Sequence, residues 1–271
     1  MNRTVMGMKI ALLQMMVTAD KETNLKRAEE LVKKAAQGGA DMAVLPEMFN
    51  CPYDNAFFRE YAEPKGGETY IRLAGMAKEH AIYVVGGSIP QIRDNKIYNT
   101  SYTFDRQGNE IHDYSKTHLF DIQVEGGQVF RESDTLTPGD GMGVFETEFG
   151  LFGLGICFDV RFQSDWELLQ KQGALVCIVP GAFNMTTGPA HWELLFRGRA
   201  VDNQLFMVGV SPARNLAFSY HAYGHSLVAD PWGSVLTQLG FEEEVAVVTV
   251  DLDRVASVRR QIPILTPPVT E

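Results

Sequence analysis

The stretch LFGLGICFDVRF, residues 151–162, runs from an apolar segment into a cysteine and then into two charged residues. The apolar segment has the length and composition of a buried strand, which places Cys157 at the strand's C-terminal end. Ligands of α/β proteins gather at such ends. Gly153 and Gly155 allow close backbone approach and a sharp turn, where the N–H of Phe158 can stabilise an oxyanion. The stretch therefore predicts an α/β sheet that presents a thiol at its edge.

Strands and helices alternate on both sides of this stretch. Thr23 or Asn24 is the expected N-cap of a first helix, which is followed by helices predicted over 70–80, 164–171, 190–202 and 255–261. Strands are expected at 9–15, 42–45, 82–88, 151–157, 175–179, 205–211 and 245–251. Hairpins are expected to pair 98–104 with 110–114 and 225–229 with 234–238. This alternation predicts mixed sheets covered by helices.

Length and charge limit the possible functions. No run of Pro, Gly and Ser divides the 271 residues, so we expect one domain over 1–271 with an extended tail from about 263. No segment approaches the roughly 18 apolar residues of a membrane span, and the N-terminal apolar stretch predicts a strand rather than a signal peptide. The 24 Lys and Arg against 34 Asp and Glu give a formal charge of −10, which disfavours nucleic acid and anionic membranes as partners.

Three cysteines do not form a disulfide framework in a chain of this length, which favours a reducing, cytoplasmic location. From its position alone, Cys157 is equally well explained as a small buried apolar residue. Cys177 lies inside an apolar run and fits that description better. Cys51 lies close to Glu47 and is a weaker rival nucleophile.

Two more polar residues follow predicted strands. Glu47 comes directly after a strand that Pro46 ends, and Lys116 follows strand 110–114. Each alone is well explained as a solvated charge. Together with Cys157, they supply a carboxylate that carries a proton, an ammonium that lowers the pKa of the thiol and holds an oxyanion, and a nucleophile. Because sheet ends can converge, we expect the three to form a site that attacks a carbonyl group.

Other patterns carry less weight. His221 and His225 have the i, i+4 spacing of a helical metal pair, but Gly224 and the following strand pattern oppose a helix, so no metal site is expected. No P-loop and no GxGxxG loop opening a helix supports nucleotide binding, and no cofactor is expected. His118 is the one histidine beside a motif, and a cysteine protease would need it as the partner of the thiol.

Three motifs around these residues resemble the nitrilase or carbon–nitrogen hydrolase superfamily, whose members carry a Glu, Lys and Cys triad. LPE at 45–47 resembles the Glu motif, YSKTHLF at 114–120 the Lys motif, and GICFDVRF at 155–162 the Cys motif. The resemblance implies a four-layer αββα sandwich with two mixed β-sheets between helix layers. It also implies a homodimer or higher homo-oligomer formed through helices near the nucleophile, and a second glutamate, Glu132, that orients Lys116.

The stretch PGAFNMTTGPAHWELL at 180–195 is similar to the omega-amidase branch, whose members hydrolyse the terminal amide of 2-oxoglutaramate and 2-oxosuccinamate. The resemblance implies an amidase that releases ammonia through a thioester on Cys157, without metal or cofactor. Deaminated glutathione, an N-carbamoyl compound and a nitrile stay open as substrates, and a catalytically silent binding protein is the alternative outside enzymes. Gly198, between Arg197 and Arg199, departs from the expected pattern and costs a helix about 1 kcal/mol relative to alanine.

Five residues are expected to contact the substrate, and these are Phe158, Arg161, Tyr53, Phe183 and Thr187. Arg161 is the nearest cation in sequence for a substrate carboxylate. It is explained equally well as a scaffold residue that pairs with Asp159 or Glu47.

Overall fold

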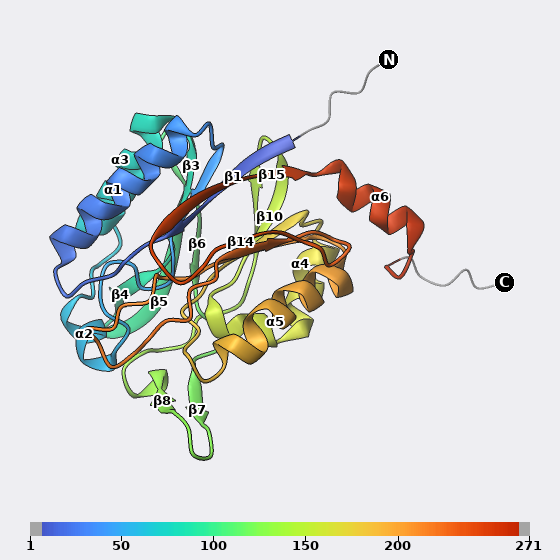
Figure 1. Cartoon of the computed structure of the whole chain (residues 1–271). Coiled ribbons are helices and arrows are strands. Elements are labelled where there is room, and N and C mark those ends of the chain that lie inside the picture. Colours follow the sequence, from blue (N-terminus) through green and yellow to red (C-terminus); the bar gives the residue numbers. More distant parts are fainter. Residues whose placement is uncertain (1–6, 266–271) are drawn as a thin grey trace.

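The computed structural model describes residues 7–265 and contains two large sheets with helices on both outer sides (Figure 1). The first large sheet contains β1 (Gly7–Gln14), β2 (Met42–Val44), β3 (Tyr83–Val85), β4 (Ile89–Arg93), β5 (Lys96–Phe104), β6 (Glu110–Ser115) and β15 (Glu244–Asp251). The second contains β9 (Val144–Thr147), β10 (Gly150–Leu154), β11 (Val176–Pro180), β12 (Phe206–Val210), β13 (Leu227–Ala229) and β14 (Val235–Gln238).

The order of the strands mixes parallel and antiparallel neighbours in both sheets. The first sheet runs β15-β1-β2-β3-β5-β4, with β6 also paired to β5, and the second runs β14-β13-β12-β11-β10-β9. Strand β1 is parallel to β2 and antiparallel to β15, and β10 is parallel to β11 and antiparallel to β9. The predicted sandwich of two mixed sheets between helices is confirmed.

The helices form the outer layers. Helices α1 (Lys21–Gln37) and α3 (Glu68–His80) lie on the outer side of the first sheet, whereas α4 (Gln163–Lys171) and α5 (Gly188–Asn203) lie on the outer side of the second (Figure 1). Helix α6 (Asp253–Gln261) extends away from the sandwich, and the hairpin of β7 (Asp121–Gln123) and β8 (Val129–Arg131) protrudes from it. The short elements are α2 (Asn55–Glu60) and the 3-10 turns η1 (Glu132–Asp134) and η2 (Cys157–Arg161).

Strand β1 illustrates why the strands are apolar runs rather than alternating patterns. Its Ile10 and Leu12 belong to the core between the two sheets, whereas Ala11 and Leu13 pack in the core under α1 and α3. Successive side chains of a strand point to opposite faces, so a sheet covered on both faces needs apolar residues at every position.

The first helix starts earlier than predicted. Its N-cap is Asp20, whose carboxylate accepts a hydrogen bond from the N–H of Thr23, so the prediction of Thr23 or Asn24 as cap is wrong. Asn24 is buried and donates instead to the carbonyl of Thr18. The helix ends at Gln37, and Gly38 is its C-cap.

Several short elements escaped prediction, and several strands, including β3 and β10, are shorter than expected. Helix α2 and strands β4, β7, β8 and β9 have three to six residues, too few for a periodic pattern to develop. Strand β10 ends at Leu154, so Cys157 does not lie on the strand but opens η2.

The tail predicted from 263 lies beyond α6, and its residues 266–271 are outside the described part of the chain. Between residues 7 and 265, no helix has both the length and the apolar character that crossing a bilayer requires.

Gly87 decides how closely two segments of the first sheet approach each other. Its backbone is left-handed, with φ of 53°, and a Cβ at this position would lie 2.0 Å from the carbonyl oxygen of Pro46. No side chain fits there unless the segment carrying Pro46 and Glu47 moves.

Gly87→Ala should therefore lower the free energy of unfolding by more than about 2 kcal/mol, because overpacking and backbone strain add. Gly198→Ala is the matched control, since a Cβ there meets no atom within 4 Å and α5 continues through the position. The control should keep or raise stability by up to about 1 kcal/mol. Urea unfolding of both variants measures the difference, and equal stability of the two would contradict the steric argument.

Candidate active site

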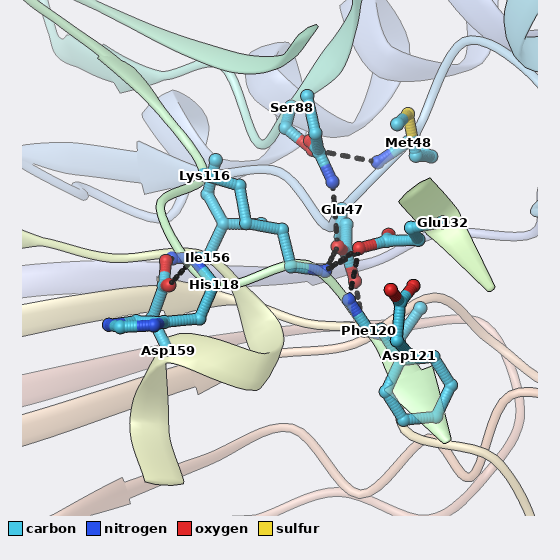
Figure 2. A network of polar contacts seen from close by, with 12 residues as sticks. Glu47, Met48, Ser88, Lys116, His118, Phe120, Asp121, Glu132, Ile156 and Asp159 are labelled. Atoms are coloured by element: carbon cyan, nitrogen blue, oxygen red, sulfur yellow. Dashed lines mark hydrogen bonds and ion pairs between the residues drawn. The ribbon is translucent and has the colours of Figure 1, made fainter. Parts of the chain in front are cut away.

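Three of the predicted polar residues meet at one point although they are far apart in sequence. Glu47 follows β2, Lys116 follows β6, and Glu132 opens η1. The ammonium nitrogen of Lys116 lies 2.9 Å from Oε1 of Glu47 and 2.9 Å from Oε2 of Glu132 (Figure 2). All three side chains are fully buried. The ammonium therefore exchanges water for two carboxylates.

Glu132 is held in place by hydrogen bonds from two other segments of the chain. Its Oε1 accepts the hydroxyl of Tyr53, and its Oε2 accepts the N–H of Phe120 at 2.6 Å. These bonds fix the carboxylate against Lys116 (Figure 2). An ammonium has three donors, of which Glu47 and Glu132 engage two. One N–H of Lys116 remains for a further oxygen, such as that of a bound carbonyl group.

Glu47 accepts hydrogen bonds on both oxygens. Oε1 also receives the side-chain amide of Asn99 at 2.8 Å, and Oε2 receives the backbone N–H of Ala182 at 2.8 Å. Met48 directly after it has a left-handed backbone, with φ of 52°, and its N–H donates to Ser88 (Figure 2). Burial raises the pKa of Glu47, the Lys116 ammonium opposes this, and the second carboxylate adds to it. A raised pKa suits a group that takes and returns a proton near neutral pH.

Cys157 sits in a strained turn beside this cluster. Its φ of 49° is unusual for a residue with a side chain, and such strain costs of order 1–3 kcal/mol. Gly181 makes room for the turn, since a Cβ there would lie 3.2 Å from the Cys157 Cα. The thiol lies close enough to Glu47 for each group to influence the pKa of the other.

Burial and the Glu47 charge raise the pKa of the Cys157 thiol well above its usual value, although Lys116 acts in the opposite direction. The expectation that the ammonium lowers the pKa of the thiol is right in direction, but burial, the largest influence, and Glu47 outweigh it. Two carboxylates already neutralise the ammonium. Moving the thiol proton to Glu47 keeps the total charge of the cluster constant, so it avoids adding a buried negative charge.

Asp159 connects the turn that carries Cys157 to the segment that carries Lys116. Its carboxylate accepts the N–H of Ile156 at 2.8 Å, the N–H of His118 at 2.9 Å and the hydroxyl of Tyr114 at 2.8 Å. Figure 2 shows Asp159 between Ile156 and His118. These bonds hold the residue before the cysteine and residues on both sides of the lysine.

Arg161 pairs with neither Asp159 nor Glu47. Its guanidinium lies over the rings of Phe158 and Phe183, at 5.5 and 5.0 Å from their centroids, and the ring nitrogen of His191 is 3.3 Å away. Its Nε is buried and has no hydrogen-bond partner among residues 7–265. Burial lowers the pKa of this group, and a thiolate at Cys157 would oppose that shift. A half-buried cation without a carboxylate is suited to receive an anion.

The other expected contact residues differ in their settings. Tyr53 and Phe183 are buried near the cluster, Tyr53 through Glu132 and Phe183 through Arg161. Phe158 packs edge-on against Phe120 at 5.3 Å. Thr187 instead bonds through its N–H and hydroxyl to Asn184 in the turn before α5. No contact of Thr187 with the Lys116 cluster is found within the described residues.

The rival sites lack the required contacts. Burial raises the pKa of Cys177 to about 12 and that of Cys51 further. The ring of His118 stacks on Phe162, and its Nε2 lies 2.6 Å from Asp165. These contacts occupy the imidazole, so it does not pair with a thiol. His225 belongs to no helix, and no group of three or more His, Cys, Asp and Glu side chains within residues 7–265 is arranged to hold a metal.

The pocket beside Glu47 contains residues that sequence reasoning missed. Aromatic and apolar side chains line it, including Met48, Phe218 and Tyr220. Tyr220 stacks on Tyr53 at 4.5 Å, and its hydroxyl donates to the carbonyl of Ala182. Tyr220 and Asn99 carried no sequence signal, because one lies in a loop and the other inside a predicted strand.

The ionisation of Asp159 should affect stability. Burial raises its pKa to about 6 from 3.8, despite the donors that lower it. The folded protein therefore keeps a proton between these values that the unfolded chain has released, so stability falls as pH rises through this window. Between pH 4.5 and 7 the free energy of unfolding should drop by about 2 kcal/mol relative to Asp159→Asn. Urea titrations at both pH values measure this, and a constant difference would contradict it.

Comparisons with known proteins agree with this geometry. The carbon–nitrogen hydrolase family model matches residues 9–260. The chain is 49% identical to Omega-amidase NIT2 of Xenopus tropicalis over 94% of this chain and 93% of that protein, and 46% identical to Omega-amidase NIT2 of Homo sapiens over 94% and 93%.

Solved structures share the fold. The crystal structure of Saccharomyces cerevisiae Nit3, a member of branch 10 of the nitrilase superfamily, aligns with a TM-score of 0.89 and 40% identity over 97% of both chains. The C. elegans NitFhit protein aligns with a TM-score of 0.87 and 29% identity over 96% of this chain and 64% of that one. The chain therefore belongs to the carbon–nitrogen hydrolase family of the nitrilase superfamily.

Proposed function

We propose that this protein is an omega-amidase that hydrolyses the terminal amide of 2-oxoglutaramate or 2-oxosuccinamate, with Glu47, Lys116 and Cys157 as its catalytic triad. The observation that carries the proposal is the buried Lys116 ammonium between two carboxylates, with the Cys157 thiol beside one of them. Identities of 46–50% to proteins named omega-amidase support the choice of substrate.

The first half-reaction forms a thioester. Glu47 takes the thiol proton while the sulfur of Cys157 attacks the amide carbon, and the electron pair of the C=O bond moves to the oxygen. The remaining N–H of Lys116 and the N–H of Phe158 stabilise that oxyanion. When the C–N bond breaks, Glu47 returns the proton to the nitrogen and ammonia leaves. Glu132 holds Lys116 in position throughout.

The second half-reaction restores the thiol. Glu47 takes a proton from water, whose oxygen attacks the thioester carbon, and Lys116 again stabilises the oxyanion. The C–S bond then breaks, the acid leaves, and the proton passes from Glu47 to the sulfur of Cys157. No step requires a metal or an organic cofactor.

Arg161 is proposed to bind the carboxylate at the far end of the substrate. It is the cation that stands beside the nucleophile without a carboxylate of its own. The formal charge of −10 repels an anion, so a local cation is needed to attract one. Tyr53 and Phe183 are proposed to bound the pocket, and Thr187 its outer rim.

Two copies are proposed to associate through the outer faces of α4 and α5, where Leu168, Leu194 and Val201 are exposed apolar side chains. Sedimentation velocity that detects only monomer would contradict this.

The three cysteines are all free, which supports action in the reducing cytoplasm.

Cys157→Ala should abolish ammonia release from 2-oxoglutaramate, because no other group can form the thioester. Intact-protein mass spectrometry after acid quench of the wild type should detect an acyl adduct on Cys157. Cys177→Ala is the matched control and should keep both activity and adduct, since that thiol is buried in β11.

Retained ammonia release in Cys157→Ala would end the proposal. No turnover of any amide combined with no adduct on the wild type would favour a silent binding protein. A panel that adds deaminated glutathione, an N-carbamoyl amino acid and a nitrile separates the alternative substrates.

Arg161→Met should lower kcat/KM for 2-oxoglutaramate by about 10- to 100-fold, because a hydrogen-bonded ion pair contributes about 1.5–3 kcal/mol. A neutral amide of the same length should lose less than about threefold. Arg197→Met, an exposed arginine on α5, is the control and should change neither. An equal loss for the charged and the neutral amide would assign Arg161 to the scaffold.

A further inference from the structure

Asn99 lies at the centre of β5 and contacts both ends of the Glu47–Lys116 pair. Its side-chain nitrogen donates to Oε1 of Glu47 at 2.8 Å. Its backbone carbonyl accepts the backbone N–H of Lys116, also at 2.8 Å. The side chain is fully buried. The nitrogen rather than the oxygen of the amide must face Glu47, because two acceptor oxygens at this distance would repel each other.

The two oxygens of Glu47 are not equivalent. Oε1 receives both Lys116, at 2.9 Å, and Asn99, at 2.8 Å. A carboxylate oxygen has two lone pairs, so these two donors saturate it. Neither the ammonium nor the amide NH2 group can accept a hydrogen bond. A proton on Oε1 would therefore point at another hydrogen.

Oε2 has a different environment. It receives one donor, the N–H of Ala182 at 2.8 Å, which leaves one lone pair. The thiol of Cys157 is the neighbouring group that has a proton to give to Glu47. We propose that Asn99, together with Lys116, assigns the transferred proton to Oε2 of Glu47, which makes Asn99 a positioning residue of the acid–base step.

The assignment rests on the proposed function and refines it. With Oε1 blocked, Glu47 takes the proton on Oε2, the oxygen bonded to Ala182. Ala182 follows β11 and Cys157 follows β10, both strands of the second sheet. Asn99 also stabilises the carboxylate form, because its donor bonds to the charged oxygen. The other titratable or charged groups that face Glu47 are Lys116 after β6, Glu132 in η1, Cys157 in η2, and Tyr53 and Tyr220 from two loops.

Asn99→Leu tests the assignment, since leucine has a similar size and no donor. Loss of one hydrogen bond to a carboxylate should shift the acidic limb of the kcat/KM profile upward by about one pH unit or more. At pH 7, kcat should fall about 10-fold or more, with KM changed less than about threefold. Ser101→Ala is the matched control on the same strand face, because the buried Ser101 hydroxyl has no partner among the described residues.

A second readout does not depend on turnover. The pH dependence of Cys157 alkylation by iodoacetamide should shift in the same direction in Asn99→Leu and in the smaller Asn99→Ala, which preserves a test if leucine prevents folding. Unshifted profiles in the folded variants would overturn the assignment. That outcome differs from failure of the proposed function. The proposed function fails if the Cys157→Ala variant still releases ammonia.

Discussion

The buried ammonium of Lys116 is the constraint on which the rest of the site depends. Removing a charge from water costs several kcal/mol, and here two carboxylates at 2.9 Å offset that cost. Burial alone would lower the pKa of Lys116, but Glu132 and Glu47 outweigh it and raise the pKa. The carboxylates need supports in turn, and they obtain them from Tyr53, Phe120, Asn99 and Ala182. The charged cluster therefore determines which hydrogen-bond donors must surround it.

The site exists only when the two sheets pack together. Glu47 and Lys116 follow strands of the first sheet, whereas Cys157 and Ala182 follow strands of the second. The core between the sheets, which includes Ile10, Leu12, Phe152 and Ile178, therefore sets the distance between the proton carrier and the thiol. Asp159 adds a polar connection across the same boundary through its bonds to Tyr114 and His118. The packing of the two sheets therefore also positions the residues of the candidate site.

The electrostatics of the cluster support the proposed role of Cys157, whose thiol is neutral, as the nucleophile. Burial raises the pKa of Cys157, and a thiolate would also add negative charge to two carboxylates around a single ammonium. Transfer of the proton to Glu47, whose pKa is also raised, keeps the total charge constant. Arg161 stands apart from this balance, because its partners are two aromatic rings and His191 rather than a carboxylate. The site therefore separates the charges used in proton transfer from the cation available to a substrate.

The sequence by itself determined the layered α/β architecture and identified Glu47, Lys116 and Cys157, because apolar runs and strand-end residues are local properties of the chain. The motifs around them also pointed to Glu132. Only the tertiary structure decided that Cys157 lies outside its strand, at φ of 49°, and that burial raises its thiol pKa despite the opposing ammonium of Lys116. It alone identified Asn99, Tyr220 and the role of Asp159, since their partners lie 38 to 52 residues away in sequence. Hydrogen bonds over such separations depend on strand order and sheet packing, which no local pattern encodes.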